Sequence, residues 1–269
     1  MERPATRPTD GIRYVAIGDS FSEGVGDELP DGTVRGWTDL FAQGWADALG
    51  EPIEYANLAI RGKLIEGIVE EQLEAALALE PTHLSLNGGG NDMLRPRADL
   101  DRIIALAEHV VDRCRDTGVE LLLLSGGNPC RHLPLGRRIE HRGDQLAYRL
   151  EDEMQHHPGV VVSQNWFDQT LATARFWTQD RLHMNTRGHH RVAARLLERI
   201  GLDARQDWWD FDFDDSEPRL RGVAYYRTHV GPWIKRRLTG ASSGDGMTAK
   251  HPSWIEVAPS GAGIRVGLA

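Results

Sequence analysis

The chain has 269 residues, of which 40% are hydrophobic and 26% are charged, a composition typical of globular proteins. Its formal net charge of -9 argues against nucleic acid as a main partner, because phosphate binding depends on clustered Lys and Arg. Two cysteines are too few for a disulfide framework, and no apolar run suits a secretory signal or a membrane span, so we expect a cytoplasmic protein without integral membrane association.

Apolar spacing predicts a regular alternation of strands and helices over residues 14–200. The predicted elements, in chain order, are a strand at 14–18, a helix at 37–49, a strand at 53–58, a helix at 64–79, a strand at 83–86, a helix at 100–115, a strand at 119–124, a helix at 138–155, a strand at 160–162 and a helix at 186–200. Near-continuous apolar strands separated by helices are typical of a parallel sheet covered on both faces. Since such crossovers are right-handed, we expect a three-layer α/β/α sandwich around five parallel strands.

The character of the chain changes after residue 200, which predicts a main domain over 1–202 and a C-terminal extension over 203–269. The beginning of the extension, 203–217, mixes acidic residues with aromatic ones. These aromatic residues are Trp208, Trp209, Phe211 and Phe213. Interleaved aromatics favour an extension docked on the main domain over a disordered linker, with a solvated acidic face as the alternative.

Glycine-rich stretches follow the first three predicted strands. They contain Gly18, Gly62 and the run at 88–90. In open α/β sheets, ligands bind at the carboxyl ends of the strands. The functional site is therefore expected among the residues that follow these glycines.

The residues at these strand ends include the parts of a serine-nucleophile site. Such a site needs a base, a carboxylate that orients the base, and donors for an oxyanion. Ser20 follows the first strand, and Asp180 lies three residues before His183 at the start of the last helix. The N–H groups of Ser20 and Gly62 and the side-chain amide of Asn91 are candidate donors. Each feature alone arises by chance, whereas all of them in this order form a strong signal.

Four segments resemble the sequence blocks of the SGNH, or GDSL, hydrolase superfamily. The segments are GDSFSEG at 18–24, NLAIRG at 57–62, GGGND at 88–92 and DRLH at 180–183. The resemblance covers about residues 13–200 and implies a flavodoxin-like fold. It also implies Ser20 as nucleophile, Asp180 and His183 as its catalytic partners, and Ser20, Gly62 and Asn91 as the oxyanion hole. Phe21 stands where the family name has Leu, a neighbour that tolerates variation.

The function expected from these residues is serine-dependent hydrolysis of carboxylic esters through an acyl-enzyme, as in esterases and lipases, with a small-molecule ester of open acyl length as the substrate. No metal and no organic cofactor is required by this chemistry. Two alternatives stay open: an acyltransferase that uses the same site, and a non-catalytic flavodoxin-like binding module.

Other enzyme classes fit the sequence less well. An α/β-hydrolase would show G-x-S-x-G, and nucleotide binders would show G-x-G-x-x-G or a GK[ST] loop. A zinc hydrolase built on His183, His189 and His190 would need a ligand spacing that is not present. We expect one of His189 and His190 to face the core and the other to face solvent.

Variable loops are expected to build the substrate pocket. They span 23–35, 94–99, 128–137 and 166–179. Trp166, Phe176 and Trp177 are candidates for an apolar wall, with the hydrophobic core as the alternative location.

Overall fold

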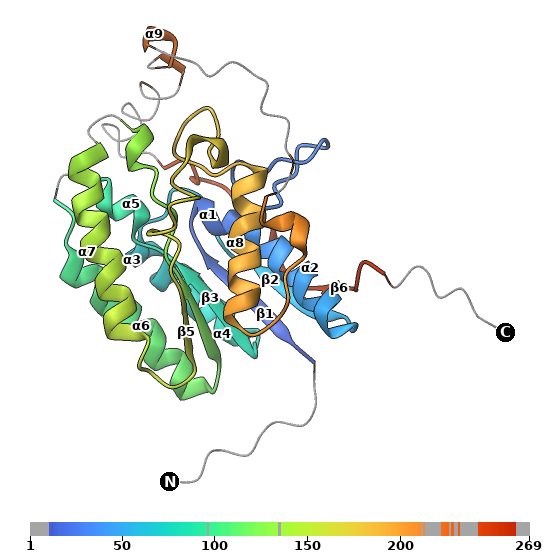
Figure 1. Cartoon of the computed structure of the whole chain (residues 1–269). Coiled ribbons are helices and arrows are strands. Elements are labelled where there is room, and N and C mark those ends of the chain that lie inside the picture. The colour runs from blue at the N-terminus through green and yellow to red at the C-terminus, as the bar shows by residue number, and fades with distance from the viewer. Residues whose placement is uncertain are drawn as a thin grey trace.

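The structure, a computed structural model, describes residues 11–95, 97–133, 136–210, 212, 222–225, 227–228, 231 and 242–261. Its centre is a six-stranded sheet in the order β5-β4-β3-β1-β2-β6 (Figure 1). The strands are β1 (Arg13–Gly18), β2 (Ile53–Asn57), β3 (His83–Asn87), β4 (Glu120–Leu124), β5 (Val160–Ser163) and β6 (His251–Val257). The first five strands pair in parallel, and β6 runs antiparallel along β2.

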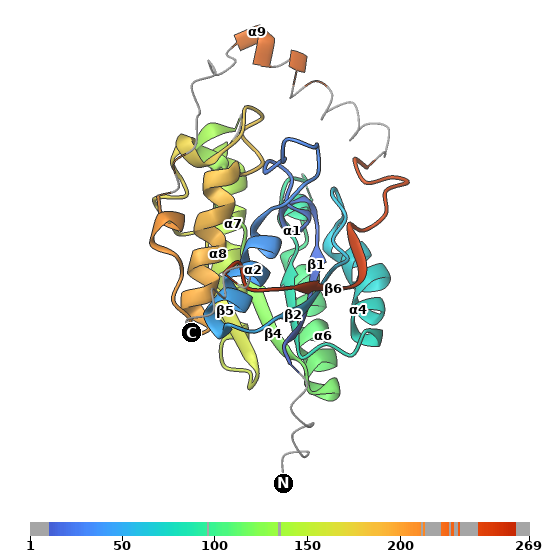
Figure 2. The same cartoon turned by 90° about the vertical axis from the view of Figure 1, so that its right-hand side faces the viewer.

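The predicted α/β/α sandwich with five parallel strands is confirmed, and β6 adds a strand that was not predicted. Without β6 the order β2-β1-β3-β4-β5 is the flavodoxin-like one, whose topological switch point lies between β1 and β3. Figure 2 shows β6 beside β2 at the edge of the sheet. Functional residues are therefore expected in the loops that follow β1 and β3.

Successive residues of each strand point to opposite faces of the sheet, which produces two cores. In β1, Val15 and Ile17 face one core, whereas Tyr14 and Ala16 face the other. The first core is covered by α3 (Ile65–Ile68), the π-helical turn η1 (Val69–Leu73), α4 (Glu74–Ala78), α6 (Leu100–Thr117) and α7 (Gly136–Met154). The second is covered by α2 (Trp37–Leu49) and α8 (Thr186–Arg199). Because both faces are covered, most residues of the five parallel strands are buried.

Local signals fix where the long helices begin and end. Asp99 accepts a hydrogen bond from the N–H of Arg102 at the start of α6, and Gly118 ends this helix in the left-handed conformation. Asn185 caps α8 by accepting from the N–H of Gly188. The cap on α8 fixes the direction of the loop that carries His183 into this helix.

The expectation for the two histidines of α8 is wrong for one of them. His189 and His190 are both buried. His189 Nδ1 accepts the N–H of Trp37 at 3.0 Å, so this ring joins α8 to α2. Burial lowers the pKa of His189 to about 4, which keeps the ring neutral.

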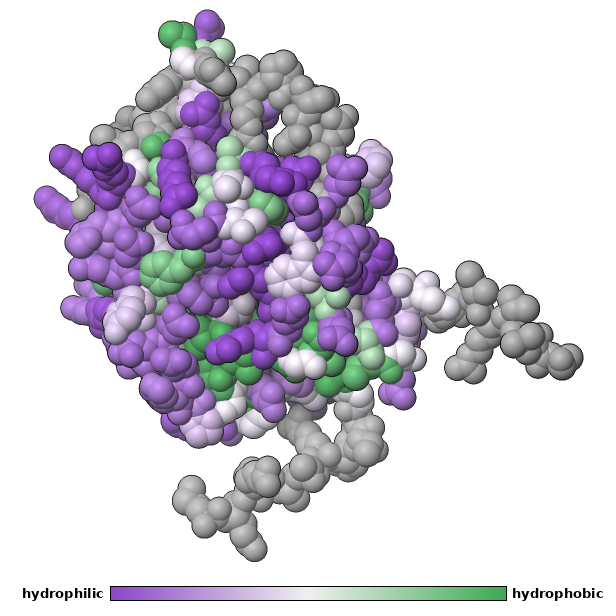
Figure 3. Space-filling model, in the orientation of Figure 1, coloured by the Kyte–Doolittle hydropathy of each residue, from purple (hydrophilic) through white to green (hydrophobic). Residues whose placement is uncertain are grey.

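The start of the extension contacts the main domain. Trp208, in the short helix η4 (Gln206–Trp208), is buried, and its ring meets that of His190 edge to face. Phe211 and Phe213, which the sequence grouped with it, lie outside the described residues. The surface seen in Figure 3 is mostly hydrophilic, as burial of the apolar residues in two cores implies.

Candidate active site

Ser20 is the first residue of the one-turn helix α1 (Ser20–Glu23), directly beyond the end of β1. Asp19 caps this helix by accepting from the N–H of Phe21 at 3.1 Å. The peptide groups of Gly18 are held by Gln72 of the π-helical turn. Its Oε1 accepts from the N–H of Gly18 at 2.8 Å, and its Nε2 donates to the carbonyl of Gly18 at 3.0 Å. The turn that carries Ser20 is thus held by Gln72 before the serine and by the Asp19 cap after it.

His183 and Asp180 lie in the loop before α8, in one hydrogen-bonded row with Ser20. His183 Nε2 lies 3.1 Å from Ser20 Oγ, and His183 Nδ1 lies 2.6 Å from Asp180 Oδ2. The second carboxylate oxygen, Asp180 Oδ1, accepts from the N–H groups of Leu182 and His183 and from the hydroxyl of Thr178. The spacing of three residues lets the carboxylate fold back on its own loop.

Two opposing effects act on the pKa values of this pair. Burial raises the pKa of Asp180, but the hydrogen bonds and charge of His183 outweigh it and hold that pKa well below its usual range. Burial lowers the pKa of His183, but the hydrogen bond and charge of Asp180 outweigh it and raise that pKa above its ordinary value. The pairing therefore favours an ionised carboxylate and makes the imidazole a stronger base.

Asn91, in the short helix α5 (Gly90–Met93) after β3, lies next to Ser20's turn. Its Nδ2 donates to Asp19 Oδ2 and to the carbonyl of Lys63, both at 3.0 Å. Both amide hydrogens thus have acceptors, so donation to a third group requires that one of these bonds be shared or opened. Burial is the main cause that raises the pKa of Asp19 to about 6.

Gly62 lies in the loop after β2, between the helix of Ser20 and Asn91. The N–H of Arg61 donates to Glu23 Oε2 of α1 at 2.7 Å, and the carbonyl of Lys63 accepts from Asn91. The residues on both sides of Gly62 are thus joined to the elements that carry the other two candidate donors. The φ of 77° at Gly62 is in the left-handed region that favours glycine.

A largely apolar pocket of about 120 Å³ opens beside Ser20, His183 and Asn91. Its apolar lining comes mainly from α5 with the residue after it, from α7, and from the loops after β4 and β5. These apolar residues include Met93, Leu94, Pro129, Ile139, Leu146, Ala147, Leu150, Trp166 and Trp177. Trp166 and Trp177 line the pocket and are at the same time buried members of the two cores, whereas Phe176 is buried in the core beside α8 and does not line the pocket.

The sequence did not identify three residues that support the site. Gln72 holds the turn before Ser20, Thr178 bonds Asp180, and Tyr225 donates its hydroxyl to the carbonyl of Asp180 at 3.1 Å. The ring of Tyr225 also stacks against the guanidinium of Arg181, 4.0 Å from the ring centroid. The contacts of Gln72 and Tyr225 join segments 54 and 45 positions apart, and the local contact of Thr178 with Asp180 belongs to none of the sequence blocks.

Other kinds of site find no support in the described part of the chain. Within it, no three His, Cys, Asp or Glu side chains are grouped as metal ligands would be. Among the same residues, no helix has both the length and the apolar character that crossing a membrane requires.

A flavodoxin-like sheet with Ser20, His183 and Asp180 at its switch point has the architecture of the SGNH hydrolase class. The chain belongs to the GDSL-like Lipase/Acylhydrolase family, whose model matches residues 16–191. The resemblance drawn from the four sequence blocks is therefore confirmed.

The relatives are distant in sequence, and the solved structures among them are similar in fold. The uncharacterized protein YpmR of Bacillus subtilis (strain 168) is 23% identical over 219 residues, which cover 72% of this chain and 84% of YpmR. The lipase Lip_vut3 from a goat rumen metagenome superimposes with a TM-score of 0.55 at 18% identity, over 71% of this chain and 98% of the lipase. A catalytic mutant of Axe2, an acetylxylan esterase from Geobacillus stearothermophilus, gives a TM-score of 0.58 at 19% identity, over 72% of this chain and 95% of Axe2.

Proposed function

We propose that this protein hydrolyses small carboxylic esters through an acyl-enzyme formed on Ser20. The observation that carries the proposal is the hydrogen-bonded row of Ser20, His183 and Asp180 beside a largely apolar pocket. Membership of a lipase and acylhydrolase family supports the same reaction class.

In the acylation half, Ser20 Oγ attacks the ester carbonyl while His183 Nε2 takes the hydroxyl proton. Asp180 keeps the other ring proton on Nδ1 and stabilises the imidazolium that forms. The tetrahedral intermediate collapses when His183 returns its proton to the leaving alcohol, which leaves the acyl group on Ser20. Water activated by the same imidazole then releases the acid.

The oxyanion of each tetrahedral intermediate accepts hydrogen bonds from the N–H groups of Ser20 and Gly62 and from Asn91 Nδ2. As charge develops on the oxyanion, it competes with Asp19 and Lys63 for the amide hydrogens of Asn91. Donors that strengthen their bonds in the transition state raise kcat more than they lower KM. This chemistry uses no cofactor.

The apolar lining of the pocket favours an acyl chain longer than acetyl. Each methylene that enters the pocket contributes up to about 0.8 kcal/mol, or roughly fourfold in kcat/KM. A series of p-nitrophenyl esters from acetate to palmitate tests this, and we expect kcat/KM to rise from acetate until the pocket is filled. Glycerol or a sugar added in parallel detects acyl transfer, and an absence of turnover with every ester would favour the binding module.

A further inference from the structure

A segment of the C-terminal extension lies against the loop that carries Gly62. We call this segment, Ser242–Lys250, the C-terminal strap. It leads directly into β6 and falls outside the family match at 16–191. Its first turn is closed by its own hydrogen bonds, including one from the N–H of Ser242 to Asp245 Oδ2 at 2.8 Å. The strap therefore has a defined conformation where it meets the main domain.

Glycines on both sides permit this contact. A Cβ added at Gly244 would overlap the carbonyl oxygen of Arg61 and lie 2.7 Å from Ile60 Cγ2. A Cβ added at Gly62 would lie 2.8 Å from Ser243 Oγ. The backbones of the strap and of the loop at 60–62 thus touch, and the loop has no room to move toward the strap.

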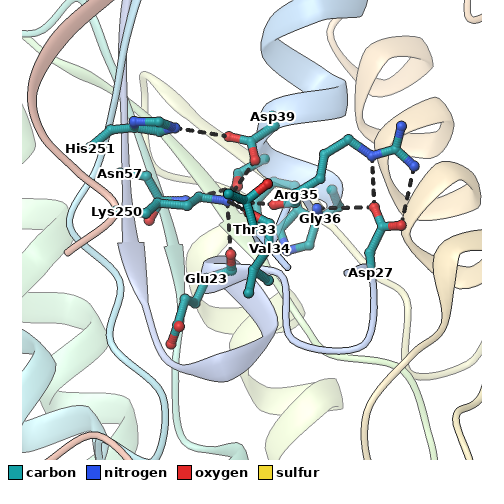
Figure 4. Close-up of polar contacts among 12 residues, drawn as sticks. Glu23, Asp27, Thr33, Val34, Arg35, Gly36, Asp39, Asn57, Lys250 and His251 are labelled. Carbon is teal, nitrogen blue, oxygen red and sulfur yellow. Dashed lines mark hydrogen bonds and ion pairs between the residues drawn. The ribbon is translucent and has the colours of Figure 1, made fainter. Parts of the chain in front are cut away.

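The other end of the strap is anchored near the helix of Ser20. Lys250 Nζ donates to the carbonyl of Glu23, the last residue of α1, at 2.8 Å and to Asp39 Oδ2 at 2.6 Å. It also donates to the carbonyl of Arg35 (Figure 4). The Lys250 side chain is only 16% exposed, so its charge is compensated by these oxygens rather than by water.

Glu23 joins the two contacts of the strap. Its carbonyl accepts from Lys250, and its carboxylate accepts from the N–H and the guanidinium of Arg61. The loop at 60–62 is therefore held by Glu23 through Arg61 and is covered by Gly244 of the strap. Both ends of the strap act on the residue that precedes Gly62.

We propose that the C-terminal strap is a positioning element of the active site, which holds the Gly62 N–H at a fixed distance from Ser20. The inference rests on the function proposed above, because Gly62 is a donor only if an oxyanion forms on a substrate bound to Ser20. Lys250 and Gly244 act through Glu23 and Arg61 and touch no reacting atom.

The test uses the full chain with Gly244→Ala, and Gly261→Ala in the same extension as the matched control. The added methyl at 244 displaces the loop, whereas a Cβ at 261 meets no atom within 4 Å. We expect Gly244→Ala to lower kcat up to about 100-fold with little change in KM, as misplacement of a donor does. Phosphonate titration of reactive Ser20 gives kcat per folded site, and the melting temperature is measured on the same samples.

Hydrogen exchange provides a readout that does not depend on activity. Amides of the peptide around 58–64 should exchange about tenfold faster in Gly244→Ala than in the wild type or Gly261→Ala, because local opening becomes easier. Lys250→Met keeps the aliphatic stem and removes the ammonium, and we expect it to change both readouts in the same direction. Arg113→Met, which removes only an exposed ion pair with Glu74, is its control.

The outcomes separate this proposal from the proposed function. Unchanged exchange at 58–64 in Gly244→Ala would overturn the strap as a positioning element, and so would faster exchange with wild-type kcat per titrated site. A wild-type protein that hydrolyses no ester would refute the proposed function, while the exchange of 58–64 would still decide whether the strap holds this loop.

Discussion

At the scale of single residues, the contact between His183 and Asp180 determines the pH at which the proposed base works. Asp180 raises the pKa of His183 above its ordinary value, so protons leave the imidazole later as the pH rises. The neutral ring is the base, and kcat/KM should therefore climb with pH through a limb above 6.5 and then level off.

Asp180→Asn removes the group that raises this pKa and leaves the burial that lowers it. We expect the limb to move to lower pH and kcat to fall by roughly 10⁴-fold, because the wrong tautomer of His183 is favoured. Full pH profiles of kcat/KM check both effects, with Asp101→Asn at an exposed ion pair as the control. A limb that stays in place in Asp180→Asn would assign the titrating group to another residue.

Asn91 provides the second test at this scale, because it is the one proposed oxyanion donor with a removable side chain. Asn91→Ala should lower kcat by about 10²–10³-fold with little effect on KM. Asn91→Asp should be at least as damaging, since its carboxylate would face both Asp19 and the developing charge. Near-normal turnover together with a lower melting temperature would instead make Asn91 a turn residue.

The sequence could reveal site residues that are marked by a strand end or by a short spacing from one another. Ser20 follows its strand within two residues and Asp180 is three residues from His183, so strand ends and loop spacing were sufficient to propose them. Thr178 and Gln72 have equally short contacts with the site. Gln72 is 54 positions from Gly18, so only the folded chain brings them together, whereas Thr178 is two residues from Asp180 but belongs to no recognised spacing.

At the scale of elements, the periodicity of apolar residues predicted the long helices closely. The expected helix at 100–115 is α6, Leu100–Thr117, because Asp99 and Gly118 fix its ends. The expected continuous helix at 64–79 contains the π-helical turn η1. Periodicity does not reveal this turn, because Ile65, Val69, Leu73 and Leu77 keep an even spacing of four residues across it.

The π-helical turn is expected to matter because it aims Gln72 at Gly18. Gln72→Leu would remove the acceptor of the buried Gly18 N–H, which costs about 1–3 kcal/mol, whereas the carbonyl of Gly18 keeps the N–H of Ile60 as a donor at 3.2 Å. Urea unfolding should therefore show a loss of about 1–3 kcal/mol, whereas Gln145→Leu on the exposed side of α7 should stay within about 0.5 kcal/mol of wild type. An unchanged stability in Gln72→Leu would show that Gly18 does not depend on this side chain.

At the scale of the whole molecule, the extension changes the sheet that the sequence predicted. The five parallel strands are mostly buried, whereas β6 contains only exposed and half-buried residues, among them Pro252. Such a strand has the composition of an edge and cannot be told from a loop by its residues. The division of the chain at residue 202 stays a prediction. Both β6 and the strap lie beyond this residue and contact the main domain, so a change in composition does not mark the end of the contacts between the two parts.

The most direct test of the account is covalent labelling of the folded protein with a fluorophosphonate, followed by peptide mapping with mass spectrometry. We predict one adduct, on Ser20, which is absent in Ser20→Ala and forms far more slowly in His183→Ala, because the imidazole must take the hydroxyl proton. Circular dichroism on the same samples verifies that each variant is folded. An adduct on another residue, such as the neighbouring Ser22, or no adduct in the folded wild type, would contradict the assignment of Ser20 as the nucleophile.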